Sequence, residues 1–522
     1  MLKIIIFFNT IIDLKLIQVI CGFKYYLLSH TIKKKTNLKS NLNKKKKDIF
    51  FIKSSDKIID NKNFIILSQK IKISDNWLIN SDPLLRYNFF YFNFINNKNN
   101  NKNYIFGFIK NFFKTSDNIK DFWDPYPTSI RLINLIKFVS KNNIKDDEIT
   151  KIISLHYINI KNNLEYRLLG NHLLTNLIAI NIFFSVYKFK NQKKDYYTKK
   201  LLLEIDNQFN DDYEHIELTP MYQGILIEQL LDLQNFNKSY QNKILNFEFL
   251  TRNMLHAYKN YHTPKDEIFF FNDTNNNSPK PKTLIEYFNK IYGKKYSVKN
   301  NLSKNFWKLQ TKNISIMTKC CGPTPIFNPG HSHADNLSFE MTYKNQKIFV
   351  NPGVFSYTGI NRLKSRQTKS HNTLVLANEN SSQIWSNFRI GKKAQTTVEK
   401  KSNKLICFSH NGYCSLFKKI IHKRKINIID KNSFTLEDEV SNTKNNSYIN
   451  LNLDPSIKNL KIKGNIIKFR NKKVYGKIIL RDQKFKVYKN LFYERFFKKK
   501  NMFSLLINTK LNKSMLKIEI NG

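Results

Sequence analysis

Three histidines stand beside short segments of alternating apolar residues, and their spacing could support acid–base or metal chemistry. His331 and His333 follow a Pro-Gly break. Side chains two residues apart on a strand point to the same face, so both imidazoles can converge on one site. His371 directly precedes a similar segment, Leu374–Leu376. One histidine could be a base and another a metal ligand, whereas a plain pair of histidines at a strand entrance would need neither role.

Two polar segments in the first half of the chain could also carry chemistry. Asn171 and His172 lie in a leucine-rich stretch that has helical spacing. An amide or imidazole buried among leucines needs hydrogen-bond partners. Tyr222 follows Thr219-Pro220, a dipeptide typical of a helix start. A satisfied core histidine and a packing tyrosine are equally good interpretations of these segments taken alone.

A third group combines aromatic rings with a guanidinium group. Trp385, Phe388 and Arg389 form the kind of surface that stacks on sugars and pairs with carboxylates. Taken singly, such aromatic residues are more often part of a core. A zinc hydrolase built on the two neighbouring histidines would have Asp335 as its nearby carboxylate, but no hydrolase motif surrounds it.

The elements that must position these residues change character along the chain. From about residue 83 to 300 the apolar residues recur at helical spacing, which predicts stacked helical hairpins in a toroid or solenoid. After about residue 312 the period changes to two, which predicts a β-sandwich. We therefore expect an α+β multidomain chain with an N-terminal (α/α) toroid and a C-terminal antiparallel β-sandwich. The expected divisions are 1–75 without defined structure, 76–305 for the toroid and 306–522 for the sandwich.

Composition limits the classes of partner. The 522 residues include 88 Lys and Arg against 39 Asp and Glu, a formal charge of +49. Such a charge concentrates polyanions near the surface. The lysines are spread among Asn, Ile and Phe without an Arg-rich stripe or a nucleic-acid-binding motif, so we expect no nucleic acid partner. The five cysteines lack metal-ligand spacing. No stretch has the ~20 apolar residues of a membrane span.

Taken together, these segments resemble the heparinase II/III family of polysaccharide lyases, which also includes alginate-lyase-like members. The resemblance runs from about residue 80 to beyond 420. It rests on ordered pieces: Leu85–Asn88, Trp123–Arg131, Gly170–His172, Glu217–Tyr222, Pro329–Phe339, Asn351–Gly353, His371–Thr373, Trp385–Arg389, His410–Tyr413 and His422–Arg424. Members of this family join an α/α toroid to an antiparallel β-sandwich. The resemblance therefore implies the same fold that the periodicity predicts.

The resemblance also implies catalytic roles for four residues. Asn171 with His172 resembles the pair that neutralises the carboxylate of a uronic acid, so that its C5 proton becomes acidic enough to remove. Tyr222 resembles the catalytic tyrosine, which acts as acid and in some members as base. His331 resembles the catalytic histidine contributed from the second domain.

A structural zinc site is a further implication. His333, Asn351 and His371 fall where the family often holds zinc with two histidines and an aspartate. An amide oxygen is a weaker zinc ligand than a carboxylate, so the asparagine argues against occupancy. Gln223 and Phe90 are two further departures from the usual residues of the family. These changes indicate a divergent branch with a different substrate or impaired catalysis.

We therefore expect an enzyme, a lyase that cleaves uronic-acid-containing glycan such as a bacterial surface polysaccharide by β-elimination. Arg131, Trp385 and Arg389 are the expected substrate-binding residues. The alternative is a non-catalytic glycan-binding or surface-polysaccharide assembly protein that keeps the lyase fold. The resemblance favours a periplasmic location, whereas the absence of a clear signal peptide leaves the cytoplasm open.

Overall fold

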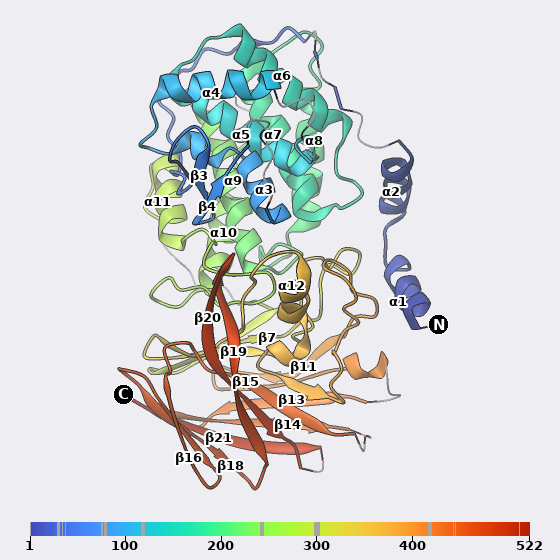
Figure 1. Ribbon diagram of the computed structural model, residues 1–522, viewed down its shortest axis with the longest axis vertical. Helices are drawn as coiled ribbons and strands as arrows, with labels where there is room; N and C mark the ends of the chain where they lie inside the picture. Colours follow the sequence, from blue (N-terminus) through green and yellow to red (C-terminus); the bar gives the residue numbers. More distant parts are fainter. Residues whose placement is uncertain are drawn as a thin grey trace.

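The computed structural model describes residues 2–28, 32–33, 35–36, 38–74, 77, 81–115, 119, 121–240, 245–296, 303–415, 420–441, 443, 445–510 and 512–522. A helical body and a body of strands are stacked along the long axis of the molecule (Figure 1). The predicted change from helix to antiparallel strand is confirmed. The first strand of the second body, β6 (Phe306–Gln310), begins slightly earlier than the expected residue 312.

Local signals set the ends of the helices in the first body. Asp82 accepts a hydrogen bond of 2.8 Å from the backbone N–H of Leu84, and Asp146 accepts one of 2.9 Å from Ile149. Such side-chain caps satisfy N–H groups that have no partner inside the helix. The helices are α3 (Pro83–Phe90), α4 (Lys102–Thr115), α5 (Pro125–Asn142), α6 (Asp147–Asn162), α7 (Gly170–Val186), α8 (Lys194–Gln208), α9 (Pro220–Ser239), α10 (Glu248–Asn260) and α11 (Pro281–Tyr292), with the 3-10 turn η1 (Asn93–Asn96).

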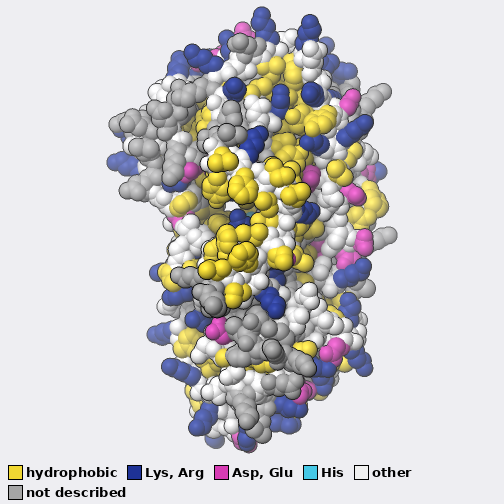
Figure 2. Space-filling model, turned by 90° about the vertical axis from the view of Figure 1, so that its right-hand side faces the viewer, with side chains coloured by type: hydrophobic (Ala, Val, Ile, Leu, Met, Phe, Trp, Pro, Cys, Tyr) yellow, Lys and Arg dark blue, Asp and Glu magenta, His cyan; other side chains and the backbone are white. Residues whose placement is uncertain are grey.

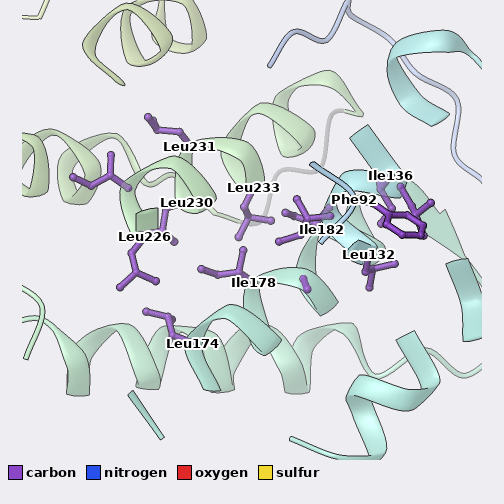
Figure 3. Packing of buried hydrophobic residues seen from close by; sticks show 14 of the residues in the cluster. Phe92, Leu132, Ile136, Leu174, Ile178, Ile182, Leu226, Leu230, Leu231 and Leu233 are labelled. Carbon is purple, nitrogen blue, oxygen red and sulfur yellow. The ribbon is translucent and has the colours of Figure 1, made fainter. Parts of the chain in front are cut away.

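Helix α7 forms the centre of the helical domain. All of its residues except His172 are buried, which is typical of a helix enclosed by others. Its side chains Leu174, Ile178 and Ile182 are fully buried and pack against α9 and α5 (Figure 3). The buried apolar residues of α5, α7 and α9 thus belong to one core. This packing holds the N-terminal ends of α7 and α9 in place.

The first 75 residues require a correction, because they contain defined elements. Two helices, α1 (Leu2–Ile11) and α2 (Leu16–Leu28), precede the short strands β1 (Asn41–Leu42), β2 (Lys57–Ile58), β3 (Asn63–Ile66) and β4 (Gln69–Lys72). Strands β2, β3 and β4 form an antiparallel sheet, and β1 pairs with β5 (Tyr187–Lys188) at the end of α7. Phe64 and Ile66 are fully buried in the helical core. Strands this short, set among Lys and Asn, have too little periodicity to detect.

The second body is a sandwich of antiparallel sheets. Its largest sheet has eight strands in the order β11-β12-β13-β14-β21-β18-β17-β16, and two four-stranded sheets, β6-β7-β8-β9 and β10-β15-β20-β19, share one core with it. Besides β6, the strands are β7 (Ile314–Lys319), β8 (Phe339–Tyr343), β9 (Gln346–Phe349), β10 (Leu374–Leu376), β11 (Thr396–Lys401), β12 (Leu405–His410), β13 (His422–Ile428), β14 (Ser433–Val440), β15 (Ser447–Asn452), β16 (Asn459–Lys463), β17 (Ile466–Arg470), β18 (Tyr475–Leu480), β19 (Phe485–Arg495), β20 (Lys498–Asn508) and β21 (Lys513–Asn521). The remaining elements of this body are α12 (Gly359–Arg366), η2 (Thr368–Ser370) and η3 (Gly412–Ser415).

The connection between β7 and β8 reaches the helical domain. Asn328 donates a hydrogen bond of 2.8 Å to the carbonyl of Leu168, and the backbone N–H of Asp273 donates one of 3.1 Å to the carbonyl of His331. Residues 328–331 are therefore fixed against the start of α7 and against the loop between α10 and α11. The two domains meet at this connection.

Candidate active site

Tyr222 and His331 come from different domains and lie in contact. Tyr222 is in the first turn of α9, and His331 is in the connection before β8. Their ring centroids are 4.1 Å apart. The hydroxyl of Tyr222 also lies 2.9 Å from that of Tyr357, whose ring centroid is 5.7 Å from that of His331. A tyrosine pair and an imidazole thus form one group at the junction of the domains.

Asp273 orients both histidines of the His331-Ser332-His333 segment. Nδ1 of His331 and Nε2 of His333 each lie 2.8 Å from one of its carboxylate oxygens. Arg362 forms a fully buried ion pair with the same carboxylate. Burial alone would raise the pKa of Asp273, but Arg362 and the two histidines hold this pKa well below its ordinary value. An ionised carboxylate only accepts hydrogen bonds, so Nδ1 of His331 is the donor in this contact, and in the tautomer that matches it the lone pair is on Nε2.

Glu217 connects the start of α7 to His331. The backbone N–H of Asn171 donates a hydrogen bond of 3.0 Å to Oε1 of Glu217, and Oε2 lies 4.0 Å from Nε2 of His331. Gly170 makes this approach possible, because it adopts a φ of +54° and a Cβ there would overlap with Oε1. The Asn171 amide nitrogen Nδ2 is buried and has no hydrogen-bond partner among the described residues. Asn171 therefore holds an unused donor, and its backbone is linked to His331 through Glu217.

His172 is the cationic candidate of the site. Its Nδ1 lies 3.0 Å from Oε1 of Glu165, and its ring packs on Tyr126 with centroids 4.6 Å apart. Burial lowers the pKa of His172, but Glu165 and Glu217 outweigh this effect, and the net pKa lies above its ordinary value. An imidazolium at this position can neutralise an acidic group of a bound ligand.

A cavity of about 400 Å³ borders this group at Tyr222 and Tyr357, whereas Asn171, His172 and His331 are not among the residues that line it. Four tyrosines, Tyr91, Tyr126, Tyr222 and Tyr357, are among the residues that line it. Burial, followed by the neighbouring Tyr357 and Tyr126, raises the pKa of Tyr222 well above its ordinary value, so its phenol stays protonated near neutral pH. The volume and the aromatic walls are typical of a small-ligand site.

The expected zinc ligands lie together but do not form a fitting zinc site. Nδ1 of His371 is 3.1 Å from Oδ1 of Asn351, and the rings of His371 and His333 have centroids 5.2 Å apart. Nε2 of His333 contacts Asp273 and Nε2 of His371 lies 3.0 Å from the carbonyl oxygen of Ser365, whereas Nδ1 of His333 is buried without a hydrogen-bond partner among the described residues. Within the described ranges no three His, Cys, Asp or Glu side chains are placed to hold a metal ion. The amide of Asn351 supplies at most a weak third ligand.

Arg131, one of the expected substrate-binding residues, requires a correction. Arg131 is fully buried and donates hydrogen bonds to Nε2 of His156 at 2.8 Å and to the carbonyls of Phe90 and Phe122 at 2.9 Å, so it supports the helical core. A buried and an exposed arginine look alike in the sequence.

Trp385 and Arg389 are also outside the cavity lining. Nε1 of Trp385 donates a hydrogen bond of 3.0 Å to the hydroxyl of Thr10 in α1. Arg389 lies near Tyr26 of α2 and Arg167, and burial is the main cause that lowers its pKa. The sequence did not predict the contact of Trp385 with α1, which leaves this side chain 42% exposed.

Sequence reasoning missed Asp273 and assigned no role to Glu217 and Tyr357. A signal for Asp273 was present: the polar run Asn272–Asn275 follows directly on the apolar run Ile268–Phe271. All four polar residues of this run are buried. In a chain with few acidic residues, a carboxylate within a polar run directly after a buried apolar run is a candidate site residue.

Comparison with known proteins agrees with this architecture. The family model described as heparinase II/III-like, C-terminal, matches residues 298–492. Residues 298–492 are thus similar to the C-terminal domain of heparinase II/III-like proteins. The curated heparin-sulfate lyase of Pedobacter heparinus is 25% identical over 367 residues, which cover 62% of this chain and 53% of that relative. The chain thus matches about half the length of this relative.

Solved structures extend the likeness beyond the heparinase II/III-like domain. A crystal structure of heparinase III matches with a TM-score of 0.68 and 14% identity, covering 97% of this chain and 85% of that one. The heparan sulfate lyase from Pedobacter heparinus matches with a TM-score of 0.57 and 16% identity, covering 87% and 79%. The predicted order of helical toroid and antiparallel β-sandwich is confirmed.

Proposed function

We propose that this chain is a polysaccharide lyase that cleaves uronic-acid-containing acidic glycan by β-elimination. The contact between Tyr222 and His331, with ring centroids 4.1 Å apart, carries the proposal. Elimination needs a proton acceptor at C5 and a proton donor at the C4 oxygen of the same sugar ring. Two such groups must therefore stand side by side at the substrate.

His331 suits the role of base, and Tyr222 suits the role of acid. Asp273 keeps the Nδ1 proton of His331 in place, so the free Nε2 lone pair can take the C5 proton. The electrons of the C5–H bond form the C4=C5 double bond as the C4–O bond breaks. The protonated phenol of Tyr222 gives its proton to the departing oxygen. Proton transfer from His331 back to Tyr222 then restores both groups.

Asn171 and His172 suit the neutralisation of the uronate carboxylate. The C5 proton becomes acidic only when the negative charge developing on that carboxylate is stabilised. The Asn171 amide has an unused buried donor, and the raised pKa of His172 favours a positive charge. Loss of one such donor costs on the order of 2.7–4 kcal/mol in other enzymes that stabilise an oxyanion.

The acidic character of the substrate has two supports. The net charge of +49 attracts polyanions, and the curated relative is named a heparin-sulfate lyase. We infer a uronate polymer, with bacterial surface polysaccharide as the class to test first. The tyrosines that line the cavity offer flat faces for its sugar rings.

The test is incubation of the purified chain with a panel of uronic-acid polymers while the ultraviolet absorbance of 4,5-unsaturated uronate is followed. The proposal expects this absorbance to rise with at least one polymer, since hydrolysis does not produce the double bond. Binding of a polymer without unsaturated product would instead support the non-catalytic glycan-binding alternative.

A further inference from the structure

Helices α1 and α2 present an unusually apolar surface. They lie along the outer side of the molecule, beside both domains (Figure 1). Figure 2 shows hydrophobic side chains gathered in a band along the middle of this face, with Lys and Arg around and between them. Exposed apolar residues occur in both helices and in their connection: Phe8, Ile12, Leu16, Phe23 and Leu27 are 64% to 82% exposed. An apolar patch of this kind marks an interaction surface.

Three uncharged polar side chains of these helices face the protein, the reverse of the usual arrangement in water. Asn9 donates a hydrogen bond of 3.1 Å to Oε1 of Gln383, and the Thr10 hydroxyl accepts one from Trp385. Gln18 is 4% exposed and donates to the carbonyls of Arg167 and Phe327, both at 3.4 Å. In water, a helix buries its apolar face and exposes its polar face. The arrangement is therefore suited to an apolar medium outside the helices.

The charges beside the apolar band are positive. Lys15 and Lys24 are exposed, and Lys33 and Lys35 are exposed just beyond α2. Asp13 is the only acidic residue between 2 and 28, and it is paired with Lys393 at 2.5 Å. Lysine side chains can extend from an apolar boundary to anionic headgroups. A second copy of this chain fits the surface poorly, because both copies carry +49.

The geometry favours a position on a membrane over a span through it. Within the described part of the chain, no single helix is long and apolar enough to cross a membrane, and α1 and α2 meet that condition only as a pair bent by 115°. Their 10 and 13 residues correspond to about 15 and 20 Å at ~1.5 Å per residue, against ~30 Å of hydrocarbon. Both helices are long enough to lie in the interface.

We propose that α1 and α2 form a docking surface for the face of an anionic lipid bilayer. The apolar side chains enter the boundary between headgroups and acyl chains, and the lysines contact the lipid phosphates. The inward-facing polar residues keep the pair fastened to the β-sandwich and to the loop before α7. The inference is independent of the proposed lyase activity, because none of these apolar residues lines the cavity.

The test is cosedimentation of the full chain with vesicles of phosphatidylcholine alone or of phosphatidylcholine mixed with phosphatidylglycerol. We expect binding to the mixed vesicles that weakens as salt is raised. The double variant Phe8→Glu/Phe23→Glu should bind at least tenfold more weakly. The matched control Phe249→Glu/Ile462→Glu removes two apolar residues, 69% and 55% exposed, from other surfaces and should bind like the parent.

Three results would overturn the proposal. The first is failure of the parent chain to bind the mixed vesicles. The second is binding of the Phe8→Glu/Phe23→Glu variant, called the α1/α2 variant, as tightly as the parent and the control. Light scattering in solution could also show a dimer that the α1/α2 variant dissolves and the control does not, which would assign the surface to a second copy. Circular dichroism of each variant checks that the helices and strands are retained.

Discussion

Nδ1 of His331 lies 2.8 Å from a carboxylate oxygen of Asp273, although the two residues are 58 positions apart in the chain. The same carboxylate also accepts from His333 and pairs with Arg362. Asp273 thus acts through His331, as a positioning residue that selects its tautomer, and it also neutralises a buried arginine. The chemical and structural effects of losing it can be measured separately.

Asp273→Asn should lower kcat strongly while leaving KM nearly unchanged. An asparagine can present its NH₂ to Nδ1, which moves the imidazole proton to Nε2 and removes the base. Loss of the orienting carboxylate in a serine protease triad lowers kcat about 10⁴-fold, and we expect an effect on that order here. Unfolding in denaturant should also show a loss of about 3–5 kcal/mol, because Arg362 is left as an uncompensated buried charge.

Asp266→Asn is the matched control, because it removes a carboxylate from a partly exposed ion pair with Lys259. Such pairs contribute about 0–1 kcal/mol, and this one is outside the cavity lining. A folded Asp273→Asn protein with the parental kcat would exclude the positioning role.

Gly170→Ala tests whether Glu217 must approach the backbone at the start of α7. The added Cβ would overlap with the Glu217 carboxylate, and φ is +54°. Gly293→Ala is the control, since its φ is +65° with open space around the position. Both changes carry a backbone cost of about 1–2 kcal/mol. Only Gly170→Ala should exceed this cost in denaturant unfolding and also reduce turnover. Equal effects of the two changes would show that the contact with Glu217 is dispensable.

The pH dependence of kcat/KM tests the charge on His172. Its folded pKa lies above the ordinary value because Glu165 and Glu217 outweigh burial. The imidazolium therefore persists to a higher pH than a free histidine, and kcat/KM for an acidic glycan should fall as pH rises through this raised pKa. Glu165→Gln should move the fall to lower pH. A profile that this variant leaves unchanged would contradict the assignment.

Zinc should not stabilise the parent chain, because Asn351 replaces a carboxylate and no three His, Cys, Asp or Glu side chains of the described residues are placed to hold a metal ion. The melting temperature should be the same with a chelator as with added zinc. Asn351→Asp restores a two-histidine, one-carboxylate set and should make the melting temperature depend on zinc. A chelator that lowers the melting temperature of the parent chain would show that the native site binds metal.

The sequence predicted the parts of the fold that repeat. The helical spacing around Leu173 and the alternation from Phe339 onward each extend over many residues, so the helical domain and the β-sandwich could be predicted. The elements before residue 75 were not predicted. Strands β1 to β4 are short, and helices α1 and α2 expose apolar instead of polar side chains, so neither shows the usual pattern. Phe64 shows this most clearly, since it is fully buried within a Lys- and Asn-rich stretch.

The site was predictable only where a residue stands in a recognisable motif. Tyr222 and His331 follow Thr-Pro and Pro-Gly breaks, and the structure brings them into contact. Asp273 has no such motif, and its partners are known only once the chain has folded. Arg131 shows the opposite error, because its motif gives no information on which way the side chain points.

Tyr222 is the proposed proton donor for elimination, and one pair of variants tests this role. Tyr222→Phe keeps the ring and its packing on His331 but removes the hydroxyl. Tyr240→Phe is the control, because that buried hydroxyl bonds to Ser140 at 2.9 Å and is outside the cavity lining. The measurement is the initial rate of unsaturated uronate formation from the best polymer of the panel, on proteins shown to be folded. We expect loss of turnover for Tyr222→Phe and the parental rate for Tyr240→Phe. The parental rate for Tyr222→Phe would show that the Tyr222 hydroxyl does not supply the proton.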